Sequence, residues 1–540
     1  MKTDQKISDD ETDYGIKASI VQVVLCVIAN TAVLSSGMTL GFTAVALPYM
    51  LKPNDEFHIT VDQASWVASI AAISTPLGCL VSGPLIDRLG RKKGLFLLNF
   101  PAFIGWLCVA INPSMTQLYI GRLLTGFACG LSSSPATVFS AESSIPSLRG
   151  YLVSGTSIAI SMGVAIVYIM GLIFKENWKL TAGLCSIFPV CSAILIGFLM
   201  PESPVWLMVN GKPDAACKSL KLLRGTNDIS DIEHELDELS ERVNMNKKGK
   251  TNLMSTIKAM GKPESYKPLI IMNLFFFFQQ LTGVFVVIFY AVDVVREAGV
   301  TMDPFIVAVL IGITRLGVTI FSAWMSRAYG RRPTAIISGV GMTVSLVTLA
   351  TFLYVTQSTH LSDTLFEGES ETNTTNLSEF FNSTLETFKP GNSSELENAE
   401  IPSPSLLPVI SILLYILAST VGFLTLPWAM IGEVYPARIR GVASGLTTCI
   451  TYLVSFVAVK LYPTMLTVLG KHGVFFFYGS MAFLGTIFVI FYLPETQGKT
   501  LAEIEKYFAG TKKKKSTADE EEALHRTQLL TIRPANKENL

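Results

Sequence analysis

A nine-residue segment that the chain contains twice is the strongest constraint on its fold. The first copy runs from Glu142 to Gly150 and the second from Glu433 to Gly441, and in both a glutamate is followed seven positions later by Arg-Gly. Each copy lies where one long apolar run ends and the next begins. A repeat with its charges at such boundaries is typical of membrane proteins built from two related halves.

Two further pairs of segments repeat in the same order. Gly90-Arg91-Lys92 returns as Gly330-Arg331-Arg332, and Pro201-Glu202-Ser203 returns as Pro494-Glu495-Thr496. The copies are separated by 240, 291 and 293 residues. The offset increases by 51 between the Gly90/Gly330 pair and the Glu142/Glu433 pair because the second half contains an additional polar segment.

Composition agrees with a membrane protein. Half of the 540 residues are hydrophobic, the mean hydropathy is +0.45, and only 16% are charged, against about 25% in soluble domains. The net charge of zero gives no reason to expect a nucleic-acid partner. The eight cysteines show neither metal-ligand spacing nor a disulfide framework, so we expect no metal and no cofactor.

Apolar runs of about 20 residues predict membrane-spanning helices. The twelve predicted spans are residues 20–43, 64–86, 94–112, 116–138, 150–173, 181–200, 268–292, 304–326, 334–356, 405–430, 442–464 and 473–493. The first run is too long for a cleaved signal peptide. The resulting organisation is an N-terminal segment 1–19, a six-helix half 20–200, a linker 201–267 with amphipathic helices near 215–224 and 228–243, a six-helix half 268–494 and a tail 495–540.

Charge and glycosylation signals predict the orientation. Short loops after the even-numbered spans carry the basic residues, which places both termini in the cytoplasm; these residues are Arg88, Arg91, Lys92, Lys93, Arg149, Arg327, Arg331, Arg332, Arg438 and Arg440. The acceptor sequons at Asn373, Asn376, Asn382 and Asn392 all lie in segment 357–404. That segment is acidic and polar, so we expect a disordered, glycosylated extracellular loop.

Nine short motifs in these positions resemble the sugar porter family of the major facilitator superfamily, and in particular its insect trehalose- and glucose-transporter-like branch. The motifs are Asp87–Lys92, Gly121-Arg122, Glu142…Arg149-Gly150, Pro201–Pro204, Gln279–Gly283, Gly330–Arg332, Pro427-Trp428, Glu433…Arg440-Gly441 and Pro494–Thr500. The resemblance covers residues 20–508. It implies an all-α major facilitator fold of twelve helices in two pseudo-symmetric halves, and a transporter rather than an enzyme.

The repeated charges are candidates for a cytoplasmic gate, the role that the resemblance implies for them. Ion pairs at helix ends can join the halves when the cytoplasmic side is closed and separate when it opens; the candidates are Asp87, Arg88, Arg91, Glu142, Arg149, Arg331, Arg332, Glu433 and Arg440. The alternative is that they only set orientation and cap helices. Asp87 precedes its basic cluster where the second half has Arg327, so the two sets of pairs cannot be fully symmetric.

The predicted seventh span contains the candidate substrate contacts Gln279, Gln280 and Thr282. Carboxamides both donate and accept hydrogen bonds, as sugar hydroxyls do, and the ring of Trp428 offers a flat apolar face. In sugar porters the residues matching Gln279, Gln280 and Trp428 contact sugar. Hydrogen bonding between helices, or ordinary packing of the tryptophan, would explain these residues without a ligand.

Much of the family's sugar-binding set is different in this chain. Ser157, Phe285 and Arg315 replace a glutamine and two asparagines, and the polar Glu, Asn and Trp positions of helices ten and eleven read Thr420, Thr451 and Tyr452. Arg315 lies in the middle of a span with no acid in that span's apolar core. It is expected to face a hydrated cavity, where it could meet a substrate oxygen, an anionic substrate or a carboxylate such as Asp293.

The sequence favours facilitated diffusion over proton coupling. Proton-coupled sugar porters place an acid just after a Gly-aromatic pair in helix one, whereas here Thr43 follows Gly41-Phe42. We therefore expect a plasma-membrane uniporter of a hexose or trehalose that works by alternating access and needs no obligate protein partner. The alternatives are a non-transporting sugar sensor with this fold, and a carrier of an organic anion that engages Arg315.

Overall fold

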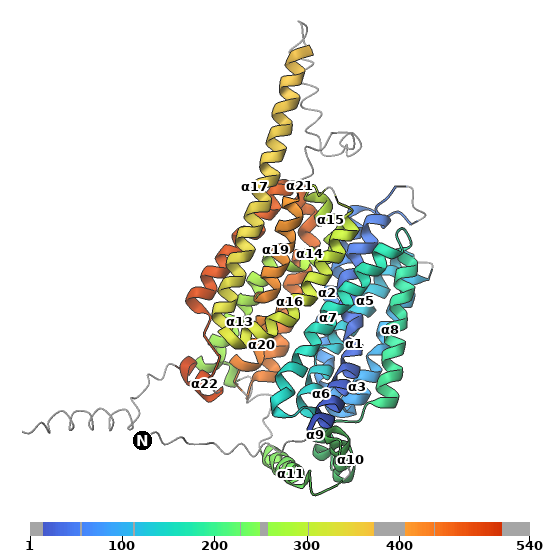
Figure 1. Cartoon of the computed structure of the whole chain (residues 1–540), viewed down its shortest axis with the longest axis vertical. Coiled ribbons are helices and arrows are strands. Elements are labelled where there is room, and N and C mark those ends of the chain that lie inside the picture. The colour runs from blue at the N-terminus through green and yellow to red at the C-terminus, as the bar shows by residue number, and fades with distance from the viewer. Residues whose placement is uncertain are drawn as a thin grey trace, which may run out of the picture.

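The computed structural model describes residues 15–53, 57–111, 114–226, 228–248, 258–300, 302–371, 406–436, 438–499 and 501–509. Within these ranges the regular structure is entirely helical. The helices form one elongated bundle, with the blue to teal first half beside the yellow to red second half (Figure 1). The all-α fold class is thereby confirmed. The four predicted glycosylation asparagines lie outside the described residues.

The first half contains the six predicted spans, two of them interrupted. Its helices are α1 (Gly15–Met50), α2 (Val61–Leu89), α3 (Arg91–Leu97) with α4 (Asn99–Ala110), α5 (Met115–Ser132) with α6 (Pro135–Ser143), α7 (Pro146–Ile173) and α8 (Trp178–Leu199). Close packing of α2 on α5 requires glycine, because a Cβ on Gly78 would lie 2.1 Å from the carbonyl oxygen of Phe127.

The second half repeats this plan with more interruptions. Its helices are α13 (Pro263–Leu281), α14 (Val284–Phe289) and α15 (Ala291–Glu297), then α16 (Pro304–Tyr329), α17 (Arg331–Glu371), α19 (Leu407–Val421) with α20 (Leu426–Val434), and α21 (Arg440–Tyr492). A kink at Gly470, where φ is 69°, divides α21 into the last two predicted spans.

Nine helices among the described residues are long and apolar enough to cross a membrane. Twelve spans were expected. The predicted fourth span, α5 with α6, and the predicted seventh span, α13 to α15, are not among the nine, and the last two spans are joined in α21. In addition, α17 continues to Glu371, into segment 357–404 that we expected to be a disordered loop. Residues 357–371, the part of that segment in the helix, contain no proline and no glycine before Gly368.

Short helices lie at one end of the bundle. The linker contains α9 (Pro204–Val209), α10 (Pro213–Arg224) and α11 (Glu233–Lys248), close to the two amphipathic helices expected there, and α22 (Leu501–Ala509) follows α21. Arg224 fastens the linker to the first half by donating to the carbonyl oxygen of Ser143 at 3.0 Å. Lys267 of α13 donates to the carbonyl oxygen of Phe508, so α22 is held by the second half. We call this end of the bundle, which carries Arg91, Glu142, Arg331 and Glu433, the charged end (Figure 1).

Gly90 offers a stability test of the charged end. Its φ of 96° and ψ of 168° lie in a region that is essentially restricted to glycine, and a Cβ there would lie 2.2 Å from Oε2 of Glu202. We expect Gly90→Ala to cost roughly 1–3 kcal/mol of stability and to lower the unfolding temperature of the purified protein in detergent, followed by tryptophan fluorescence. Gly445→Ala is the control, because an added Cβ there meets nothing within 4 Å. Equal unfolding temperatures for the two variants would contradict this account.

Candidate functional site

The first half carries a cluster of ion pairs at its charged end. Arg91, the first residue of α3, donates from Nε and Nη2 to the two carboxylate oxygens of Glu142 at 2.9 and 2.8 Å. Ser203 donates to the same carboxylate at 2.5 Å. Nη1 of Arg91 reaches the carbonyl oxygen of Ile86 and lies 3.6 Å from Asp87. The guanidinium thereby joins α2, α3 and α6, and the Ser203 hydroxyl adds the start of α9 to the same network.

The second half builds the same cluster from the repeated residues. Arg331, the first residue of α17, donates to the two carboxylate oxygens of Glu433 at 3.3 and 2.7 Å. Thr496 donates to Glu433 at 2.6 Å, as Ser203 does to Glu142. The remaining nitrogen of Arg331 donates to the carbonyl and hydroxyl oxygens of Ser326, each at 2.7 Å. The sequence repeat is therefore a repeat of contacts.

A second glutamate caps each arginine-bearing helix. Glu202 accepts hydrogen bonds from the backbone N–H groups of Arg91 and Lys92, and Glu495 accepts from those of Arg331 and Arg332. Carboxylates are stabilised at a helix N-terminus, where N–H groups lack partners within the helix. Burial raises the pKa of the Glu495 carboxyl, but the backbone donors around it outweigh that effect and hold its pKa below the ordinary value.

In this conformation the charged pairs lie within each half and do not join the two halves, so their role as a gate stays a prediction. Arg91 pairs with Glu142 inside the first half, and Arg331 pairs with Glu433 inside the second. Arg149 and Arg440 donate to the carbonyl oxygens of Ser144 and Tyr435, five residues before them in the chain. Arg332 donates to the carbonyl oxygen of Ile490, again within one half, and Arg88 is exposed. The residues repeat because each half needs its own cluster.

Among the described residues, polar contacts join the halves in the middle of the bundle and toward its opposite end. In the middle, Ser161 of α7 is 2.9 Å from Thr319 of α16. Farther from the charged end, Thr43 and Tyr168 donate to the carbonyl oxygens of Phe289 and Ile288 at 2.8 and 2.7 Å. At the opposite end, ion pairs join Lys175 to Asp303 at 2.5 Å and Lys460 to Asp62 at 2.7 Å. Sequence reasoning missed these bridges, because isolated polar residues in separate spans do not indicate their partners.

Three of the candidate substrate residues lie together where α13 ends. Gln279 is fully buried, and its amide nitrogen donates to the carbonyl oxygens of Phe423 and Leu424 at 2.6 and 3.1 Å. These carbonyls belong to the interruption between α19 and α20, so the Gln279 side chain stabilises that break. Thr282 donates to the carbonyl oxygen of Gln279 at 2.7 Å. The amide donors of Gln279 are thus occupied by the protein.

Gln280 is the better placed of the two carboxamides to meet a ligand. Its amide nitrogen donates to the side-chain oxygen of Gln279 at 3.2 Å. Its own oxygen Oε1 is buried and has no partner among the described residues. Leaving a buried acceptor unpaired is unfavourable, so this oxygen is a candidate acceptor for a substrate hydroxyl.

Three aromatic rings of the second half form a group that reaches from α13 to α21. The rings of Trp428 and Phe276 meet edge to face with their centroids 4.8 Å apart, and the centroid of Tyr452 lies 6.1 Å from that of Trp428. Tyr452, Thr39, Thr75, Phe285 and Ser455 are among the residues that line a cavity of about 10 Å³ formed by both halves. This volume holds about one water molecule, so in this conformation the cavity does not accommodate a sugar.

Arg122 and Arg315 are two arginines buried in the middle of the bundle. Arg122 donates from Nε and Nη1 to the carbonyl oxygens of Val67 and Thr39, and only its Nη2 has no partner among the described residues. Arg315 is 5% exposed, and its Nε and Nη1 have no partner among the described residues. The expected partner Asp293 instead lies 3.9 Å from Arg296. Arg315 therefore carries a buried charge with unused donors.

The surroundings of Arg315 place it where the two halves meet. One turn before it in α16, a Cβ on Gly312 would lie 3.1 Å from the ring of Tyr168. One turn after it, Thr319 donates to the Arg315 carbonyl oxygen and contacts Ser161. Ser157 is exposed on α7, the helix that faces α16 here.

Among the described residues no group of three or more His, Cys, Asp or Glu side chains is arranged to hold a metal ion.

The fold belongs to a known class of membrane transporters. The xylose transporter XylE from E. coli in its inward open conformation superposes with a TM-score of 0.68 at 20% identity, over 90% of this chain and 99% of that one. A partially occluded inward open conformation of the same transporter superposes with a TM-score of 0.66. Two duplicated helical halves of this kind define the major facilitator fold.

Sequence comparison gives the family. Residues 19–366 and 387–508 match the sugar (and other) transporter family. The facilitated trehalose transporter Tret1 of Polypedilum vanderplanki is 30% identical over 93% of this chain and 92% of its own length. The transporter of the same name from Aedes aegypti is 29% identical, and this chain spans about half of it, 56% of its length. The chain is a multi-pass membrane protein and belongs to the sugar transporter family.

The two adjacent glutamines predict different mutant phenotypes. Gln279→Ala leaves the carbonyl oxygens of Phe423 and Leu424 unpaired, so it should lower stability by roughly 1–3 kcal/mol. Gln280→Ala removes no bond that holds a helix break, so it should reduce sugar uptake several-fold while stability and surface expression stay at the wild-type level. Uptake per surface molecule and unfolding temperature measure the two effects. Wild-type uptake by Gln280→Ala would refute its role as a substrate contact.

Proposed function

We propose that the protein is a uniporter that moves trehalose or a hexose down its concentration gradient by alternating access. The observation that carries this proposal is the distribution of contacts: each half is tied together by its own charged cluster, whereas contacts between the halves lie in the middle and at the opposite end. Such an arrangement suits two bodies that rock against each other around a central site. The named relatives, which are facilitated trehalose transporters, support the choice of sugar.

The bridges at the opposite end are weak enough to break in each cycle. Asp62 is 77% exposed in its pair with Lys460, and Lys175 is 48% exposed in its pair with Asp303. Exposed ion pairs of this kind contribute about 0–1 kcal/mol each. A substrate that binds one conformation more tightly by a few kcal/mol can therefore shift the equilibrium.

A uniport mechanism fits the residue that follows Gly41-Phe42 in α1. A proton-coupled carrier needs a group in the path that gains and loses a proton. The position after Gly41-Phe42 is Thr43, whose hydroxyl donates to the carbonyl oxygen of Phe289. This side chain bridges the halves without titrating near neutral pH.

We place the protein in the plasma membrane with both termini and the charged end in the cytoplasm. The support is the distribution of Arg and Lys in the short loops and of the four sequons in segment 357–404. With this orientation the ion pairs of Lys460 and Lys175 lie at the extracellular side. The bilayer and a small sugar are the only partners that this function requires.

A second candidate function is the transport of an anionic substrate, and Arg315 is the observation that favours it. Its guanidinium is buried at the junction of α7 and α16 with Nε and Nη1 unused. A carboxylate or phosphate group would use both charge and donors, whereas a neutral sugar would use only the donors.

Uptake by oocytes expressing the full chain tests the proposed function. We expect saturable uptake of labelled trehalose or glucose that is unchanged between two external pH values, with no uptake of an uncharged polyol control. Uptake that rises as the external pH falls would contradict the uniport mechanism. No uptake of either sugar by protein confirmed at the cell surface would contradict sugar transport and favour the sensor.

The same assay separates the two substrate classes. Under the sugar proposal a hexuronate competes poorly, and Arg315→Gln lowers sugar uptake by less than about tenfold, the equivalent of roughly 1.4 kcal/mol. Strong competition by the hexuronate that is lost in Arg315→Gln would favour the anion carrier instead. Arg315→Lys keeps the positive charge but removes the planar guanidinium, so its uptake shows whether the charge or the guanidinium geometry is needed.

A further inference from the structure

A second pocket, lined by none of the candidate sugar contacts, is larger than the cavity between the halves. It has a volume of about 350 Å³ and lies between α13 and the two segments of α21. Ten residues line it, and nine of them are apolar: Phe277, Leu281, Leu453, Val454, Val457, Ala458, Leu461, Met465 and Phe477, with Tyr478 as the tenth. A sugar needs many hydrogen-bonding partners, so this pocket does not suit the transported substrate.

The rim of the pocket is continuous with the membrane-facing surface. Phe277, Leu453, Val457 and Leu461 are each more than 40% exposed. In a membrane protein such an exposed apolar surface is covered by lipid. The occupant therefore comes from the bilayer and is largely hydrocarbon.

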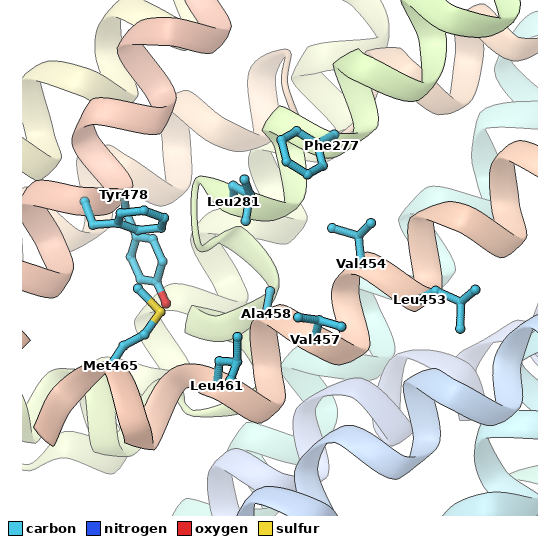
Figure 2. Close-up of a pocket in the computed structure, with 10 residues that line it drawn as sticks. Phe277, Leu281, Leu453, Val454, Val457, Ala458, Leu461, Met465 and Tyr478 are labelled. Carbon is cyan, nitrogen blue, oxygen red and sulfur yellow. The ribbon is translucent and has the colours of Figure 1, made fainter. Parts of the chain in front are cut away.

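The pocket is a slot with its polar group at one end. From Leu453 to Met465 it follows twelve residues of α21, about 18 Å at the rise of an α-helix. Figure 2 shows Tyr478 beside Met465 at one end, and Leu453, Val454 and Phe277 toward the other. The Met465 end lies beyond Lys460 along α21, and the ion pair of Lys460 with Asp62 is at the end of the bundle opposite the charged end. The polar end is thus toward the membrane surface and the apolar end toward the interior.

Tyr478 supplies an unused hydroxyl at that end. The side chain is 3% exposed, and its hydroxyl has no hydrogen-bond partner among the described residues. A buried hydroxyl without a partner is unfavourable, so a ligand with one polar group at its outer end would complement the slot.

The walls favour a rigid, flat ligand over a flexible chain. Aromatic side chains of Phe277, Phe477 and Tyr478 contribute to the lining from α13 and the second segment of α21, and aliphatic side chains such as Val454 and Leu461 from its first segment. A rigid ring system loses less conformational entropy on binding than an acyl chain does. We propose that the slot binds a membrane sterol, with the sterol hydroxyl at Tyr478 and the rings lying along α21 toward Leu453.

The bound sterol would lie against the break that carries the two glutamines. Leu281 is the last residue of α13, and a Cβ on Gly283 would lie 2.6 Å from the ring of Tyr478. The sterol therefore packs against residues that flank the junction of α13 and α14. Binding would restrain this junction and thereby change the rate of the conformational cycle.

Photolabelling of the full chain tests the site. The protein is reconstituted in phospholipid nanodiscs with a cholesterol analogue that carries a diazirine on its rings, and labelled peptides are mapped by mass spectrometry. We expect labels within residues 453–478, competed by unlabelled cholesterol. Ala458→Phe, which fills the slot, should reduce this labelling at least tenfold. Val344→Phe, on an exposed position of α17, is the matched control and should leave it unchanged.

A more conservative variant keeps the test informative if the Ala458→Phe protein does not fold. Tyr478→Phe keeps the ring against Gly283 and removes only the hydroxyl, so cholesterol should compete several-fold less well. Equal labelling in Ala458→Phe and wild type would overturn the site. Labelling of the same residues by a photoreactive phosphatidylcholine that cholesterol does not displace would overturn the sterol. Unchanged competition in Tyr478→Phe would overturn the assigned orientation.

Discussion

The bidentate pair between an arginine and a glutamate within each half is the interaction on which the rest of the structure depends. In the first half the Arg91–Glu142 pair holds together helix ends that are separated by 50 residues of sequence, and Ser203 ties the start of the linker to the same carboxylate. The second half achieves the same with Arg331, Glu433 and Thr496. Breaking a largely buried pair of this kind is costly, roughly 3–5 kcal/mol. Each half therefore has reason to keep its cluster through a conformational change.

The connections between the halves are of a different strength. Among the described residues the polar contacts between the halves include the Ser161–Thr319 hydrogen bond, two hydrogen bonds to backbone carbonyls and two ion pairs with exposed carboxylate or ammonium groups. Ion pairs that are largely buried within the halves and more exposed between them allow the halves to move as units. Of the interrupted helices, α14 and α15 pack on α1 of the first half. Within the second half the Gln279 side chain satisfies backbone carbonyls that an unbroken helix would satisfy itself.

The sequence predicted the architecture more accurately than it predicted which side chains contact each other. Apolar runs and the spaced repeat were sufficient for the spans and for the equivalence of Glu142 with Glu433. They could not show which charges pair, because equivalence says only that both halves make the same contact. The breaks at Ser133 and Gly283 also escaped prediction, since a polar residue or glycine in an apolar run is compatible with a continuous helix. The slot at Tyr478 is formed by three chain segments and has no sequence signature.

The distance between the halves at the charged end is the measurement that tests this account most directly. Spin labels at Arg88 and Arg438, exposed positions in different halves, report on that distance, and labels at Arg88 and Ser147 report within the first half. The native cysteines are replaced, and double electron–electron resonance is recorded with and without saturating sugar. The account predicts that sugar redistributes the Arg88–Arg438 distances while the Arg88–Ser147 distances stay fixed. Sugar-dependent change within the first half, or none between the halves, would contradict it.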